Sequence, residues 1–305
     1  MGKRSRNKAG VEASGSGSRQ PCHCGSGLRY RNCHGGKSPA VVHVARPFEG
    51  LRGERDLVAL REFIPAGTAK ATVDGREVIF ASLLPGAAPA IARDNGEVLI
   101  GLQVQHSYRD ASRDLAATLE LALAAEPGQV LGLGADPGEG VRLQDLLDDG
   151  IGDVVVHEDF GYWLPEDAEV TDGMREALEQ ANHAITATRA VAGVESAYWT
   201  DVLSKEYLRW VVADEESAAL DALAKLHVAG ADRLVEGARL VGMFRTCGLI
   251  VPVWDLLPGT GSEVIADPLA VFVERFAELI EAGGSLTLEE RGARAGLLSR
   301  QLTLR

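Results

Sequence analysis

The pattern of apolar and polar residues indicates regular secondary structure from Leu51 onward. Leucines recur at helical spacing over residues 54–63 and 110–125, and these stretches end at Pro65 and before Pro127. Because proline cannot continue a helix, both endings agree with the periodicity. We therefore expect a helix over each stretch.

Two tight turns in the same region predict hairpins. The turns are Asp74-Gly75 and Asn95-Gly96, dipeptides that favour the two-residue connection between antiparallel strands. The apolar stretches that flank them are residues 69–72 with 77–84, and 90–93 with 97–105. Two such turns close together predict an antiparallel sheet. Further strands are expected at residues 154–157 and 162–164.

The second half of the chain repeats this order of elements. It predicts a hairpin from 197–202 and 208–212, a helix over 215–228, a strand over 248–253 and a helix from Asp267-Pro268 to Ala282. Thr287 and Glu290 form a capping box for a last helix, which either packs on the body or reaches a partner through its arginines. Duplication of one α+β unit is one interpretation of the repeated order. Residue identity between the halves is low, so duplication is held only as an alternative.

Charge is distributed unevenly along the 305 residues. Residues 1–50 carry nine Lys and Arg against two Glu, a net charge of +7, whereas residues 51–305 carry 22 against 42, a net charge of −20. A basic arm can attract RNA phosphate, lipid headgroups or an acidic protein, or it can stay solvated. Tyr30 is the one aromatic residue near these charges, which disfavours sequence-specific base readout.

The chain shows no signal for membrane insertion or secretion. No apolar stretch approaches the ~20 residues of a membrane-spanning helix, and the basic start does not lead into the apolar core of a secretory signal. We therefore expect a soluble cytoplasmic protein without a transmembrane segment.

Three of the four cysteines lie within a short Gly-rich segment. Cys22, Cys24, Cys33 and the adjacent His34 offer three thiolates and one imidazole, the ligands that Zn²⁺ prefers. The two-residue spacing of Cys22 and Cys24 lets both sulfurs reach one ion, and four protein ligands leave no position for water. One structural zinc ion is therefore expected. Disulfides or free thiols are the alternative, which the C-x-C spacing and the Cys-His pair disfavour.

The order C-x-C-x-S-G, five residues and C-H-G resembles the SEC-C motif, the zinc-binding tail of the SecA preprotein translocase that many other bacterial proteins also carry. The resemblance implies that Cys22, Cys24, Cys33 and His34 are the ligands. It also implies a docking role toward a chaperone, the ribosome, the Sec machinery or anionic lipid. The residues expected to contact the partner are Arg29, Tyr30, Arg31 and Lys37. No G-x-x-x-x-G-K-[ST] loop occurs, so motor ATPase activity is not expected.

Motifs that could carry catalysis are few. His157-Glu158-Asp159 follows a strand and can supply acid-base chemistry. Gly132–Gly138 resembles a dinucleotide loop but has the wrong spacing, so it is expected to be a loop, and Gly259–Ser262 a turn. Cys247 is expected to be an inert buried thiol. Structural roles are expected for the other histidines and for tryptophans at strand positions, which are His43, His106, His183, His227, Trp163, Trp199, Trp210 and Trp254.

Together these features predict an α+β fold, in which a zinc knuckle on a flexible arm precedes a body of antiparallel sheet and helices. The expected parts are a disordered basic arm (1–20), the zinc knuckle (21–36), a linker (37–50), two α+β halves (51–165 and 166–262) and a helical C-terminal segment (263–305). The leading hypothesis is a non-enzymatic cytoplasmic adaptor that binds zinc and docks through the knuckle. The alternatives are a hydrolase around His157 and Glu158, and nucleic-acid binding through the arm.

Overall fold

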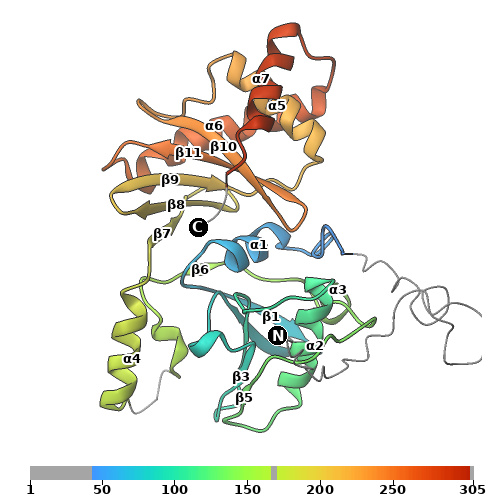
Figure 1. The fold of residues 1–305 in the computed structure, drawn as a ribbon, viewed down its shortest axis with the longest axis vertical. Coiled ribbons are helices and arrows are strands. Elements are labelled where there is room, and N and C mark those ends of the chain that lie inside the picture. The colour runs from blue at the N-terminus through green and yellow to red at the C-terminus, as the bar shows by residue number, and fades with distance from the viewer. Residues whose placement is uncertain (1–42, 166–169, 303–305) are drawn as a thin grey trace, which may run out of the picture. The chain divides into compact units, whose positions relative to one another are not determined.

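The structure is a computed structural model that describes residues 43–165 and 170–302, which from Val44 onward belong to one compact unit. Within these residues the fold is α+β, with two sheets and seven α-helices (Figure 1). The expected fold class is thereby confirmed. The stretches expected to form the basic arm and the zinc knuckle lie outside the described residues.

The first sheet has the strand order β5-β3-β4-β2-β1-β6. Its strands are β1 (Gly67–Val73), β2 (Arg76–Ala81), β3 (Ala90–Ala92), β4 (Val98–Gly101), β5 (Val130–Leu131) and β6 (Val155–Val156). The antiparallel pairs β1–β2 and β3–β4 are the two predicted hairpins. Asp74 and Gly75 have φ values of 49° and 76°, as a tight two-residue turn requires. β2 and β4 pair in parallel, a long-range feature that no local turn could indicate.

Four α-helices and two 3₁₀ turns accompany the first sheet. They are α1 (Glu54–Glu62), α2 (Ala111–Leu123), α3 (Leu143–Leu146), α4 (Asp172–Asn182), and the 3₁₀ turns Pro85–Ala87 and Gly161–Trp163. The expected helices over 54–63 and 110–125 are α1 and α2. Asp110 caps α2, because its carboxylate accepts the Ser112 N–H at 3.0 Å.

The second sheet has the order β10-β11-β9-β8-β7, and every neighbouring pair is antiparallel. Its strands are β7 (Ala187–Ala190), β8 (Ala197–Val202), β9 (Lys205–Trp210), β10 (Arg239–Thr246) and β11 (Leu249–Leu256). Two of them, β8 and β9, form the expected hairpin, although β9 begins three residues before the expected stretch 208–212 and ends at Trp210. Met243 of β10 also pairs in parallel with Gln301, so the C-terminal residues extend this edge.

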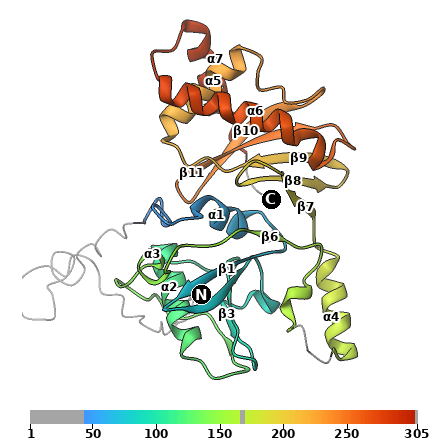
Figure 2. The same cartoon turned by 180° about the vertical axis from the view of Figure 1, so that it is seen from behind.

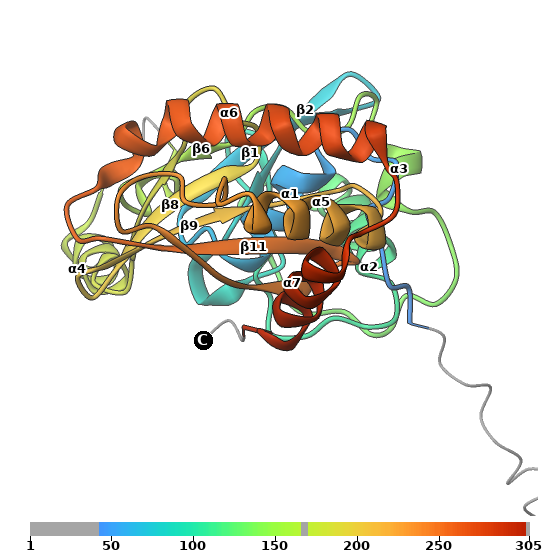
Figure 3. The ribbon, with the colours of Figure 1, turned by 90° about the horizontal axis from the view of Figure 1, so that it is seen from above.

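Three helices cover one face of the second sheet (Figure 3). They are α5 (Glu216–Val228), α6 (Gly261–Ala282) and α7 (Leu288–Ser299). Thr287 and Glu290 form the predicted capping box of α7. Arg294 on α7 binds Asp221 on α5 at 2.6 Å, so the last helix packs on the body.

Helix α1 lies between the two sheets (Figures 1 and 2). Phe63, just after α1, makes edge-to-face contacts with Tyr198 of β8 and Phe244 of β10, at centroid distances of 5.8 and 6.1 Å. Leu57 and Leu60 are fully buried in a hydrophobic cluster that contains residues of both sheets. One continuous core therefore joins the two sheets through α1, and a second core lies under α5 and α6.

The structure corrects several expectations. Residues 161–163 form a 3₁₀ turn and not a strand, because the Tyr162 hydroxyl and the Trp163 indole N–H both donate to the Leu83 carbonyl at 2.8 Å. Helix α6 begins at Gly261, within the stretch expected to be a turn, and contains Pro268 in its interior. Strand β10 was not expected at all. None of the helices in the described part of the chain has the length and apolarity needed to cross a bilayer.

Candidate functional site

The residues assigned to the zinc knuckle lie outside the described part of the chain. They are the expected ligands Cys22, Cys24, Cys33 and His34, and the expected contact residues Arg29, Tyr30, Arg31 and Lys37. The donor set itself, three thiols and one imidazole, fits the ligand preference of Zn²⁺ and has the number of donors that a tetrahedral shell needs.

The segment that leads into the body, residues 44–51, is fixed to it, and we call it the anchor segment. Phe48 is fully buried in the shared core, although it lies in the stretch expected to be a linker. Arg46 forms two hydrogen bonds with the carboxylate of Glu54, at 2.8 and 2.7 Å, and Glu54 is only 7% exposed. A bidentate, largely buried pair of this kind fixes orientation as well as position.

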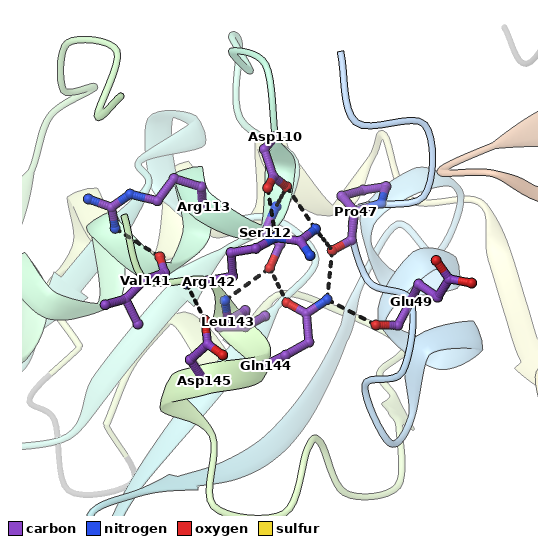
Figure 4. A network of polar contacts seen from close by, with 10 residues as sticks. All are labelled: Pro47, Glu49, Asp110, Ser112, Arg113, Val141, Arg142, Leu143, Gln144 and Asp145. Atoms are coloured by element: carbon purple, nitrogen blue, oxygen red, sulfur yellow. Dashed lines mark hydrogen bonds and ion pairs between the residues drawn. The ribbon is translucent and has the colours of Figure 1, made fainter. Parts of the chain in front are cut away.

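A polar network holds the anchor segment from a second side (Figure 4). The Pro47 carbonyl accepts hydrogen bonds from Arg142 at 2.7 Å and from Gln144 at 2.8 Å. Arg142 also binds Asp110 at 2.7 Å, and Ser112 donates to the Gln144 side chain. The starts of α2 and α3 are thereby joined to the anchor segment.

The β10–β11 turn contacts the anchor segment from the second sheet. A Cβ atom at Gly248 would lie 2.6 Å from the Arg46 Cβ and 2.9 Å from the Ala45 carbonyl oxygen. Cys247 and Gly248 have φ values of 47° and 77°. Burial, together with the Glu62 carboxylate, raises the pKa of the Cys247 thiol to about 11, so the thiol is protonated at neutral pH.

His157 lies directly after β6 and is half-buried. Its Nε2 is 2.8 Å from the Thr68 hydroxyl, and its ring lies 4.9 Å from that of Tyr162. Burial lowers the pKa of His157, although the charge of Asp159 opposes this effect. Glu158 and Asp159 are exposed, and Asp159 accepts the Gly161 N–H at 2.7 Å. The three residues of the motif therefore do not converge.

A cavity of about 420 Å³ adjoins Thr68 on the open face of the first sheet. It is lined by Thr68, Lys70, Ile79, Arg93, Asn95, Glu97, Leu99, Tyr162 and Leu164. Its charged side chains are paired: Arg93 binds Glu97 of the same wall at 2.7 Å, and Lys70 binds Glu77, which lies outside the wall, at 2.8 Å. Arg93 also donates to the Tyr162 carbonyl. Each lining charge therefore already has a partner of opposite sign.

The glycine-rich stretch Gly132–Gly138 is a loop, as the sequence predicted. No helix follows it directly, so the loop lacks the helix N-terminus at which a dinucleotide phosphate binds. It borders a cavity of about 220 Å³ beside α2, where the Tyr108 hydroxyl donates to the Gly134 carbonyl at 2.8 Å.

Comparison with known families divides the chain into two regions, and the second region begins within the anchor segment. Residues 47–305 match a family of unknown function, DUF5926. The chain belongs to this family. Residues 19–36 match the SEC-C motif, which confirms the motif seen in the sequence, and ten residues separate it from the DUF5926 region. No curated protein and no solved structure matches the chain.

Sequence reasoning did not single out the DUF5926 residues that hold the anchor segment. Arg142 lies 95 residues from its partner Pro47. Gln144 lies 97 residues from Pro47 and 95 residues from Glu49. Pairings across such distances leave no local pattern. The Arg46–Glu54 pair, only eight residues apart, is the one that a charge-pattern argument could have suggested.

Proposed function

We propose that this DUF5926 protein is a zinc-stabilised adaptor without enzymatic activity, which docks onto a cytoplasmic protein partner through its SEC-C knuckle. Cys22, Cys24, Cys33 and His34 hold one Zn²⁺, whose role is to fold the knuckle. The body presents a second, separate surface to whatever the knuckle brings near.

The SEC-C match carries this proposal. Residues 19–36 are too few and too rich in glycine to bury a stabilising core, so a metal is the means by which such a segment acquires a fixed surface. Three thiolates and a neutral imidazole complete the coordination shell. A closed shell favours a structural over a catalytic metal.

The residues proposed to dock are the basic ones near Tyr30 in the sequence. Arg29 and Arg31 flank Tyr30 in the sequence and Lys37 follows, and positive charge combined with an aromatic residue is suited to an acidic protein surface. The resemblance to the SecA tail favours the ribosome, a chaperone or the Sec machinery as partner. RNA or anionic lipid is the competing partner, and the crosslinking test below would reveal its capture.

The anchor segment supports an adaptor role. The Arg46–Glu54 pair, the burial of Phe48 and the bonds to the Pro47 carbonyl fix the chain where it enters the body. The base of the N-terminal arm is therefore a rigid part of the DUF5926 region. A partner held by the knuckle is then tethered to one defined point of the body.

Zinc analysis of the full chain tests the metal. We expect one zinc per chain in protein purified without added metal, measured by plasma mass spectrometry, and loss of that zinc in Cys33→Ser. Cys247→Ser is the matched control, because this cysteine lies outside the motif and its thiol is protonated. Retention of stoichiometric zinc by Cys33→Ser, or its loss from Cys247→Ser, would contradict the ligand assignment.

Crosslinking followed by mass spectrometry tests the docking. The wild-type chain and Cys247→Ser should capture the same protein partner, and Cys33→Ser should lose it. An unchanged set of partners in Cys33→Ser refutes docking through the knuckle. Capture of RNA or vesicles, with affinity that falls steeply with salt, would assign the arm to phosphate binding instead.

The contact between His157 and Thr68 favours a second candidate function, a hydrolase in the body. A neutral imidazole 2.8 Å from a hydroxyl, beside a cavity, can act as a general base. Hydrolysis of model esters or phosphoesters, lost in both His157→Gln and Thr68→Val, would establish it. A wild-type chain that turns over none of them would exclude this candidate.

A further inference from the structure

A cavity of about 390 Å³ lies between the end of α1 and the second sheet. It is lined by Glu62, Phe63, Pro65, Gln103, Thr186, Thr200, Val202, Tyr207 and Arg209. Figures 1 and 2 show the elements on its two sides, with β8 and β9 facing α1. The volume suits a small organic molecule.

The strand β9 directs Arg209 to this cavity. Leu208 and Trp210 are buried in the core under α5 and α6, and Tyr207 and Arg209 lie on the opposite face because side chains alternate along a strand. Thr200 of β8 is the cross-strand neighbour of Tyr207 on the same face, and it is only 2% exposed.

Arg209 is a half-buried cation without a carboxylate partner among the described residues. Its guanidinium lies over the Phe63 ring, 5.5 Å from the centroid, and it makes no hydrogen bond or ion pair within the described part of the chain. Burial lowers the pKa of Arg209, although the neighbouring Tyr207 opposes this. The group still stays charged at neutral pH, because the ordinary pKa of arginine is very high.

The rest of the cavity wall does not neutralise this charge. Among the described lining residues the one carboxylate is Glu62, and it is engaged by Arg61 at 3.2 Å. Gln103 uses its amide N–H groups on the Leu60 and Ile64 carbonyls, at 2.9 and 2.8 Å. The remaining polar side chains of the wall carry hydroxyls, and that of Thr200 also lies 3.3 Å from the Thr188 hydroxyl. A partly desolvated cation, hydroxyl groups and two aromatic rings therefore line one cavity.

We propose that this cavity binds a small organic oxyanion, a carboxylate or a phosphate ester, through the Arg209 guanidinium. The planar fork of arginine matches the oxygens of both groups. The Thr200 and Thr186 hydroxyls donate to the remaining oxygens, and the Phe63 and Tyr207 rings cover the apolar part of the ligand. Cation–π contact with Phe63 alone compensates the buried charge less well than an anion does.

Binding measurements on the full chain test this site. The probes are benzoate, phenyl phosphate and benzamide, which is a neutral isostere of benzoate. Calorimetric titration measures the binding of each probe. We expect saturable binding of at least one anion and none of benzamide. Arg209→Met should raise the Kd of that anion at least about tenfold. Tighter binding of phenyl phosphate assigns a phosphate ester, and tighter binding of benzoate assigns a carboxylate.

Stability separates ligand binding from a structural role. Without anion, Arg209→Met should unfold at the same denaturant concentration as wild type or a higher one, because it removes an uncompensated buried charge. Arg175→Met, which changes an exposed arginine paired with Asp172, is the control and should bind the anions as wild type does. The proposal is overturned if wild type binds neither anion, if Arg209→Met binds equally well, or if its fold is markedly weakened.

Discussion

Replacing Glu206 by glutamine tests how helix α6 is held on the second sheet. Glu206 is only 5% exposed, and its carboxylate accepts hydrogen bonds from the Trp199 indole at 2.7 Å, the Gly261 N–H at 2.8 Å and the Gly259 N–H. Gly261 is the first residue of α6, where backbone N–H groups have no acceptor within the helix. One buried carboxylate thus links β8, β9 and α6.

The size of the effect follows from these three bonds. A glutamine at position 206 keeps one oxygen that can accept two of them, but its amide N–H group must face a donor. The variant therefore loses one charge-assisted hydrogen bond and leaves one buried N–H unsatisfied. Together these losses should lower the free energy of unfolding by about 2–5 kcal/mol.

The effect of Glu206→Gln should depend on pH. Burial alone would raise the pKa of Glu206, but the hydrogen bonds from Gly261, Trp199 and Gly259 outweigh it and hold the pKa below its ordinary value of 4.5. A carboxylate whose pKa is depressed on folding contributes stability above its unfolded pKa and loses it as the pH falls through the folded pKa. The deficit of Glu206→Gln should be full at pH 7 and shrink below about pH 4.5.

Urea unfolding, followed by circular dichroism, measures this deficit at several pH values. Glu263→Gln is the matched control, because Glu263 also lies in the first turn of α6 but is exposed. The free energy of unfolding of Glu263→Gln should fall by no more than the helix-dipole contribution of about 0.3–1 kcal/mol. The reasoning is refuted if the two variants are equally stable at pH 7, or if the deficit of Glu206→Gln is constant down to acid pH.

Two further predictions concern packing. Gly248→Ala should lower the free energy of unfolding by about 1–3 kcal/mol, because its Cβ would lie 2.6 Å from that of Arg46; Gly75→Ala, at a similar φ but with nothing within 4 Å, should cost less in the same assay. Trp254→Phe should lower the free energy of unfolding by about 1 kcal/mol more than Trp210→Phe does. The reason is that the Trp254 indole N–H donates to the Asp232 carbonyl, whereas the Trp210 indole N–H has no acceptor among the described residues. Equal losses in chemical denaturation within either pair would contradict the corresponding prediction.

Elements with a local signal were predictable from the sequence. Asp74-Gly75 placed the first hairpin, because this dipeptide tolerates the positive φ values that the turn adopts. Thr287 and Glu290 placed the start of α7 through their reciprocal capping bonds. Each signal depends only on residues a few positions apart, and so tertiary packing did not override it.

The missed elements lack such signals. Strand β10 has a register shift between Leu240 and Gly242, which breaks the alternation of apolar residues. Its turn is Cys247-Gly248, where Asn-Gly or Asp-Gly would be expected. In α6, Pro268 resembled a first helical residue but lies in the interior. The N–H that it lacks would bond the carbonyl of Val264, a residue that is 58% exposed and accessible to water.

The cavity at Arg209 shows why a site can stay hidden in a strand whose presence the sequence predicted. Alternation along β9 places Arg209 opposite the apolar core residues, and on sequence alone that is the position of a solvated surface charge. Its burial comes from Phe63 and Gln103, more than a hundred residues earlier, which reach it only because α1 packs between the two sheets. A charge on the polar face of a strand becomes informative only when another layer covers that face.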